Sequence, residues 1–128
     1  MRLTLPLAAA ALALCAAPVM AADARGLYMD NCSACHQPTG KGIDGAFPAL
    51  AGSKAVVGSA VEPITRVLKG RGGMPSFATE LTDLEIAQIL TFVRTNWGNK
   101  GAPVQPKQVT ALRTGAKREN AKASLLAH

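Results

Sequence analysis

The clearest pattern in the chain is an apolar face that repeats at helical spacing. Behind Thr82, apolar residues recur at i, i+3, i+4, i+7 and i+11, namely Ile86, Ile89, Leu90, Val93 and Trp97. Thr82 and Glu85 have the spacing of a capping box, in which two side chains satisfy free amides at a helix start. The pattern predicts a helix that starts after Thr82 and ends at Gly98.

Three further helices are predicted, over residues 23–35, 62–69 and, more briefly, 106–113. Pro63 suits the first turn of the second of these helices, and Gly70 suits its end. Residues 37–59 are rich in glycine and small residues and predict a long loop, while little order is predicted beyond Gly115. Because no stretch alternates apolar and polar residues for long, the predicted fold class is all-α.

The beginning of the chain has the pattern of a targeting segment. A long apolar run follows a single basic residue, Arg2, and closes with small residues. This arrangement is typical of a secretory signal peptide, so residues 1–22 are predicted to be removed by cleavage after Ala21 or Ala22. Two alternatives stay open, an uncleaved membrane anchor and a lipoprotein signal at Cys15. The predicted location is the periplasm, outside the reducing cytoplasm.

The aromatic residues mark where a packed core can form. The chain has 128 residues with one Trp, one Tyr and three Phe, and all of them lie between positions 28 and 97. A core confined to roughly 75 residues is near the size at which a disulfide, a metal or a cofactor must help to stabilise it. One domain over residues 23–99 is therefore predicted, and barrels, doubly wound nucleotide-binding folds and multidomain enzymes are excluded by length.

Charge separates this domain from the rest of the chain. The chain carries a net charge of +6, yet basic and acidic residues balance between positions 23 and 99. Residues 100–128 hold six basic residues against Glu119 alone. We expect this basic extension to be largely flexible. A contact with an acidic partner or an anionic membrane surface is the alternative, and nucleic acid is not an expected partner.

The candidate chemistry lies in the pentapeptide Cys32-Ser33-Ala34-Cys35-His36. C-x-x-C-H is the signature of c-type haem attachment. One helical turn sets Cys32 and Cys35 where each thiol can add to one vinyl group of the haem, and His36 then falls under the iron as an axial ligand. One covalent haem c is therefore the predicted cofactor.

Three other uses of the pentapeptide fit the chain less well. A zinc site needs about two more ligands, and the only other histidine is His128, the last residue. A thioredoxin-like dithiol requires a βαβ setting that the pattern does not predict. A structural disulfide would leave the long loop and the small core unexplained.

With these motifs, residues 23–99 resemble the class I cytochromes c. The resemblance rests on Gly26-Leu27-Tyr28 before the pentapeptide, Phe47-Pro48-Ala49-Leu50 in the loop, the segment from Gly70 to Phe77, and the capped helix. It implies a small cytochrome c fold of three to four core helices, with long loops wrapped around one covalently bound haem. The end of the capped helix and the segments after it are also similar to haem subunits of periplasmic dehydrogenases.

The resemblance also implies further site residues. Met74 is the expected second axial ligand, since it lies among Gly72, Gly73 and Pro75, where no helix face exists for it to fill. The other methionine after residue 22, Met29, lies too close to the attachment site to reach the opposite face of the haem. In the resembled family a prolyl carbonyl accepts a hydrogen bond from the axial histidine, and Pro48 is the matching position.

Three more residues are candidates for the haem pocket. Tyr28 is expected to pack against the capped helix near Leu90 and Val93. Arg71 and Trp97, like Lys41, are candidates to meet the haem propionates, with an ordinary surface position as the alternative.

Two protein ligands on the iron favour electron transfer over chemistry at the iron. We interpret the chain as a one-electron carrier, not an enzyme, in an exported bacterial respiratory or dehydrogenase pathway. Its expected partners are redox proteins or a dehydrogenase complex. Three alternatives stay open: an electron-transfer subunit within a periplasmic dehydrogenase complex, a haem enzyme or gas sensor with an open iron position, and a small binding module stapled by a disulfide.

Overall fold

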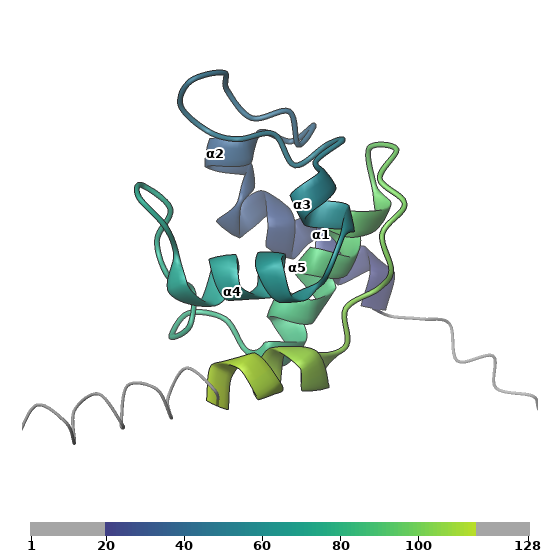
Figure 1. Ribbon diagram of the computed structural model, residues 1–128. Helices are drawn as coiled ribbons and strands as arrows, with labels where there is room; N and C mark the ends of the chain where they lie inside the picture. Colours follow the sequence, from purple (N-terminus) through teal and green to yellow (C-terminus); the bar gives the residue numbers. More distant parts are fainter. Residues whose placement is uncertain (1–19, 115–128) are drawn as a thin grey trace, which may run out of the picture.

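The computed structural model describes residues 20–114, which form helices joined by long loops (Figure 1). Five helices follow in order: α1 (Met20–Asn31), α2 (Ser33–His36), α3 (Lys54–Val57), α4 (Val61–Lys69) and α5 (Asp83–Thr95). A further helix, the C-terminal helix, covers residues 106–114. Between residues 20 and 114, β-pairing is limited to two isolated bridges, Ile43 with Phe47 and Arg71 with Met74. The prediction of a small all-α fold is confirmed.

Two predicted segments fall largely beyond this range. Residues 1–19 of the predicted signal peptide and residues 115–128 of the basic extension lie outside the described residues. Within residues 20–114, no helix is both long and apolar enough to cross a membrane.

The core is centred on the crossing of α1 and α5, visible at the middle of Figure 1. Tyr28 of α1 is completely buried, and its ring centroid lies 5.4 Å from that of Phe92 and 5.1 Å from that of Trp97. The apolar face predicted for α5 supplies most of the remaining core, with Ile86, Ile89, Leu90 and Val93 all at most 4% exposed. Each such side chain contributes about 1.5–3 kcal/mol through burial.

Helix α5 begins as its pattern predicts. Thr82 Oγ1 accepts from the Glu85 amide at 3.2 Å, and Glu85 Oε2 accepts from the Thr82 amide at 2.8 Å, which completes the capping box. The helix ends earlier than predicted, at Thr95. Trp97 and Gly98 have positive φ values of 52° and 81°, and this left-handed turn folds the Trp97 ring back against α1.

The other helices follow their predictions with two differences. Helix α4 has Pro63 in its first turn and ends at Gly70, whose φ is 68° and whose amide donates to Arg66 O at 2.8 Å. Helix α1 begins at Met20 and stops at Asn31, and α2 follows as a separate short helix. Helix α3 lies inside the predicted 37–59 loop, because four residues are too short to give a periodic signal.

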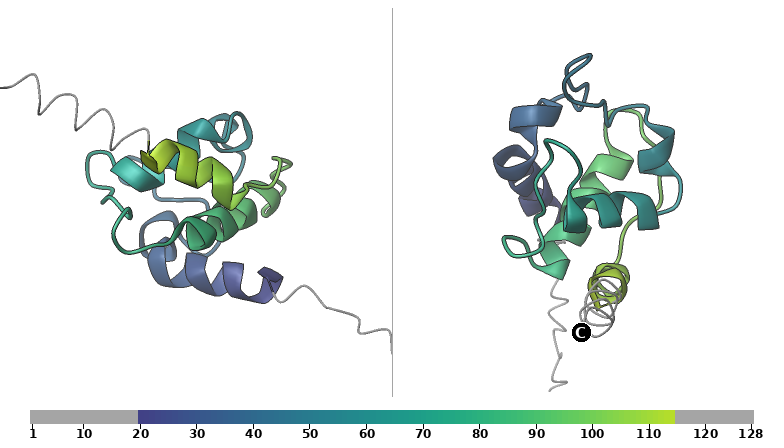
Figure 2. Two further views of the ribbon diagram at one scale, coloured as in Figure 1. Left: turned by 90° about the horizontal axis from the view of Figure 1, so that it is seen from below. Right: turned by 60° about the vertical axis from the view of Figure 1, so that its left-hand side comes forward.

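The largest difference from the sequence expectation concerns residues 100–114. Val104 and Val109 are 4% and 0% exposed, so this part of the predicted flexible extension belongs to the core. Buried Arg94 anchors its start, since Nε donates to Ala102 O at 2.8 Å and Nη1 donates to Val56 O at 2.5 Å. Figures 1 and 2 show the C-terminal helix beside α5, at the end of the molecule away from α2. The domain boundary expected at residue 99 thus falls inside the packed unit.

Candidate functional site

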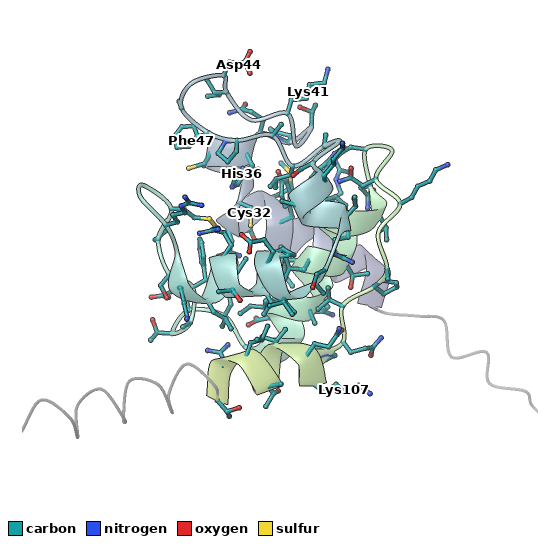
Figure 3. All side chains as sticks on the ribbon, viewed as in Figure 1. Cys32, His36, Lys41, Asp44, Phe47 and Lys107 are labelled. Atoms are coloured by element: carbon teal, nitrogen blue, oxygen red, sulfur yellow. The ribbon has the colours of Figure 1, made fainter. Side chains whose placement is uncertain are left out.

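The C-x-x-C-H pentapeptide lies where α1 passes into α2. The Cys32 amide donates to Tyr28 O at 2.9 Å, and the His36 amide donates back to Cys32 O at 3.0 Å. These bonds keep Cys32, Cys35 and His36 within one helical turn. Both cysteines are free thiols, and Cys32 and His36 lie beneath α2 on the side toward α4, while Lys41 and Asp44 point away from the body (Figure 3).

Burial keeps two ionisable groups at this turn, the Cys32 thiol and the Tyr28 hydroxyl, neutral. The pKa of the Cys32 thiol is raised to about 11, mainly because the sulfur is buried and secondly because Cys35 is close. Burial, with a smaller effect from Cys32, raises the pKa of Tyr28 to about 12. Tyr28 therefore keeps its proton and donates it to Gln37 O at 2.7 Å. This bond holds the backbone directly after His36, where Gln37 has a φ of 68°.

The imidazole of His36 is fixed by one hydrogen bond. His36 is buried, and its Nδ1 lies 2.9 Å from the carbonyl oxygen of Pro48. A carbonyl oxygen only accepts, so Nδ1 carries a hydrogen, and in the neutral tautomer of this kind the lone pair is on Nε2. Nε2 of a neutral imidazole held in this way is a metal ligand in proteins. The contact with Pro48 is the one that the family resemblance implied.

A glycine brings Pro48 to the histidine. Gly42 has a φ of 63°, and a Cβ atom built on it would lie 2.3 Å from Phe47 O and 2.7 Å from Pro48 O. Its amide also donates to His36 O at 3.0 Å. Ile43 and Phe47 close a small turn in between, each amide donating to the other's carbonyl at 2.8 Å. We call residues 37–53 the Pro48 loop.

Met74 is held by a second turn of the same kind. Arg71 and Met74 exchange two backbone hydrogen bonds, each of 3.0 Å. Gly70 has a φ of 68°, and a Cβ atom there would lie 2.4 Å from Met74 O. Ser76 Oγ donates to Leu68 O at 2.6 Å, which ties the turn back to α4. We call residues 70–82 the Met74 loop, and Met74 is half-buried within it.

The remaining candidates occupy different surroundings. Tyr28 and Trp97 lie in the aromatic cluster between α1 and α5, as described above, and the Trp97 ring also covers Gly40, where a Cβ atom would come within 2.5 Å of it. Arg71 is exposed at the start of the Met74 turn. A contact of Arg71 or Trp97 with the haem propionates stays a prediction.

Asn99 is a supporting residue that the sequence pattern did not predict. This buried side chain accepts from the Gly52 amide at 2.9 Å and donates to Leu50 O at 3.1 Å and Val93 O at 2.8 Å. Asn99 thereby joins the end of α5 to the Pro48 loop. The available signal was a polar residue directly after Gly98, which is also typical of an ordinary helix end.

The residues present fit a covalently attached haem. They supply two free thiols one helical turn apart, an imidazole with a free Nε2, and a thioether on a turn that glycine permits. Among the residues that the structure describes, no group of three or more His, Cys, Asp or Glu side chains is arranged to hold a metal ion, as a zinc site would require. An all-α fold with this motif defines a c-type cytochrome domain of class I.

Comparison with known proteins agrees with this class. Residues 19–93 match the family model described as cytochrome c oxidase, cbb3-type, subunit III, and the chain belongs to this family of c-type cytochrome domains. Cytochrome c-552 of Thermus thermophilus is 35% identical over 113 residues, which cover 72% of this chain and 85% of that protein.

Larger cytochrome subunits are also similar to the chain. The cytochrome c subunit of the quinone alcohol dehydrogenase of Gluconobacter oxydans (strain 621H) is 31% identical over 101 residues, and these cover 69% of this chain. The gluconate 2-dehydrogenase cytochrome c subunit of Pantoea cypripedii is 34% identical over 104 residues, covering 68% of this chain. The chain spans only 21% and 23% of the length of these two relatives.

Proposed function

We propose that the chain is a one-electron carrier whose haem c is attached through Cys32 and Cys35 and ligated by His36 and Met74. The observation that carries the proposal is the hydrogen bond from His36 Nδ1 to Pro48 O, because it leaves Nε2 free and fixes the imidazole plane. Bound there, haem c supplies an iron that changes its charge by one electron while both protein ligands stay in place.

The chain's own residues have three tasks in this proposal. Tyr28 and Pro48 hold the backbone and the ring of His36 so that the ligand does not move when the charge changes. The Arg71–Met74 turn presents a thioether from the other loop. A thioether favours the reduced iron more than a second imidazole would, so a fairly positive midpoint potential is expected.

Matched methionine variants test the ligand assignment. In the holoprotein, Met74→Leu should abolish the far-red absorption band that marks methionine ligation of oxidised haem c, and it should lower the midpoint potential. Met29→Leu is the control, since Met29 packs against the core from α1 and should change neither property. A band that survives Met74→Leu would overturn the assignment. A native protein without the band would favour a haem enzyme or gas sensor with an open iron position.

The relatives support a second candidate, an electron-transfer subunit held in a dehydrogenase complex. Their names place them in alcohol, gluconate and fructose dehydrogenases. The free carrier stands first because cytochrome c-552 is matched over 85% of its length, whereas the subunits are matched over about a fifth to a quarter. Native gels of the source cells, stained for haem, separate the two: a lone species of no more than about 13 kDa indicates a carrier, and co-migration with dehydrogenase activity indicates a subunit.

We also propose export to the periplasm, with residues 1–22 as a cleaved signal peptide. The apolar run behind Arg2 and the haem-attachment motif support it. N-terminal sequencing of the haem-containing protein should begin at Ala22 or Asp23. A protein that still begins at Met1 and remains with the membrane would indicate an anchor instead.

A further inference from the structure

We propose that the C-terminal helix positions the iron ligand Met74, with Arg113 as the positioning residue. The proposal rests on the proposed ligation by Met74. It assigns a role to residues 106–114, which lie beyond the predicted domain and beyond the family match at residues 19–93.

The guanidinium of Arg113 holds the end of the Met74 loop at two points and the first residue of α5 at a third. Nη1 donates to Ala78 O, Nη2 donates to Leu81 O at 3.0 Å, and Nε donates to Asp83 Oδ1 at 2.6 Å. Each nitrogen thus has its own acceptor. A planar guanidinium can make such a set of contacts, whereas a lysine ammonium on the same helix cannot match its geometry.

The helix that carries Arg113 is itself held firmly. Val109 is completely buried, and Leu112 packs against the core. Thr110 Oγ1 lies 2.5 Å from Asp83 Oδ2, so both oxygens of this carboxylate are bound by the C-terminal helix. Arg113 is therefore a fixed point against which the Met74 loop is braced.

Two successive sets of contacts, both following Met74 in the chain, hold the loop to α4 and to the C-terminal helix. On the α4 side, Ser76 Oγ donates to Leu68 O at 2.6 Å and the Phe77 amide donates to Val67 O at 2.9 Å. On the α5 side, Arg113 holds Ala78 and Leu81. The segment between Met74 and the first Arg113 contact is short, because Ala78 follows Met74 by only four residues. Loss of the Arg113 contacts leaves the segment after Met74 held by its α4 attachments alone, which lets the loop open more often.

An added ligand measures this opening. Imidazole binds the oxidised iron only while Met74 is off it, so its apparent affinity reports the fraction of protein with the loop open. Arg113→Ala removes three hydrogen bonds, and water replaces part of them because these groups are only partly buried. We expect the open fraction, and with it the apparent imidazole affinity, to rise about tenfold.

The experiment uses the full-length holoprotein and four variants. Arg113→Ala should raise imidazole affinity about tenfold and weaken the methionine band, and Arg113→Lys should fall between Arg113→Ala and the native protein. Lys107→Ala, exposed on the same helix, is the control and should match the native protein. Asp83→Asn, which weakens one of the three contacts, should give a smaller rise and serves if Arg113→Ala does not assemble with haem.

The outcomes distinguish a failure of the positioning role of Arg113 from a failure of the proposed ligation by Met74. Native protein without the methionine band overturns the ligation by Met74 itself. Native protein with the band, together with unchanged imidazole affinity in Arg113→Ala or Asp83→Asn, overturns the positioning role alone. A loss of global stability in urea with no change in imidazole affinity also overturns it, since a purely structural residue would behave in that way.

Discussion

A Cβ atom on Gly70 would lie 2.4 Å from the carbonyl oxygen of Met74, closer than side chains approach backbone atoms in folded proteins. The φ of Gly70, 68°, is also in the left-handed region. Gly42 stands in the same relation to Phe47 O in the other loop, at 2.3 Å. The Pro48 loop, which supports His36, and the Met74 loop, which carries the candidate methionine ligand, therefore each depend on a glycine that lets two backbone segments touch.

Replacement of Gly70 by alanine should displace the Met74 turn. We expect Gly70→Ala to lower the free energy of unfolding by about 3 kcal/mol, from the strained φ and the backbone clash together, and to weaken the methionine band. Gly72→Ala is the matched control, because Gly72 has a φ of 56° but no atom within 4 Å of the built Cβ. It should cost only about 1–2 kcal/mol and keep the band. Urea unfolding and absorption spectra measure both effects, and equal behaviour of the two variants would contradict the role of the close approach.

Gly42→Ala should act on the histidine instead. The added methyl group meets Phe47 O and Pro48 O, so the Pro48 carbonyl moves away from His36 Nδ1. A weaker hydrogen bond makes the imidazole a poorer donor to the iron, which disfavours the oxidised state and raises the midpoint potential. Gly45→Ala has a similar φ, 76°, and open space around the built Cβ, so it should leave the potential unchanged. Redox titration of both holoproteins measures the midpoint potentials. An equal shift of the midpoint potential in both variants would contradict the specific role of Gly42 and indicate strain in the loop as a whole.

Local signals predicted the elements that local contacts determine. The capping box of α5 and the glycine end of α4 involve residues three or four positions apart, so the sequence contains all of their partners. The end of α5 was predicted at Gly98, later than its observed end at Thr95, because the turn at Trp97 depends on the ring of Tyr28, which lies on a distant helix.

The site residues, like the helices, were predicted where the signal is local and missed where it depends on distant segments. The pentapeptide is a contiguous motif, and the family resemblance supplied Pro48 and Met74. The contributions of Gly42 and Gly70 were not foreseen, because their close contacts join segments that meet only after folding. The short helix predicted over residues 106–113 is present, but its packing on the core was missed, since its charge suggested a solvated end and only Val109 and Leu112 face the core. Two apolar residues in one short helix give too weak a periodicity to predict packing.

The contacts of Asp83 with the C-terminal helix should make the free energy of unfolding depend on pH. Its pKa is lowered, first by the hydrogen bond from Thr110 and then by Arg113, against the opposing effect of burial. A carboxyl group with a lowered pKa in the folded state stabilises the fold above its unfolded pKa, and this contribution is lost as the pH falls through the folded value. Because the pair is partly exposed, the contribution is about 1 kcal/mol at neutral pH.

The measurement compares native protein and Asp83→Asn in urea at decreasing pH. The difference in free energy of unfolding should be largest above the ordinary aspartate pKa of about 3.9 and should shrink as the pH falls below it. A difference that stays constant across this range would mean that the charge of Asp83 does not contribute.

Val109 tests whether the folding unit extends past residue 99. Its side chain is completely buried, so Val109→Ala removes two methyl groups from the core and leaves a small cavity. We expect the free energy of unfolding to fall by about 2 kcal/mol. Val61→Ala makes the same chemical change at a helical position that is 54% exposed, and it should change stability by less than about 0.5 kcal/mol. If both variants were equally stable, the C-terminal helix would not pack on the core in solution, and the brace on the Met74 loop would lose its support.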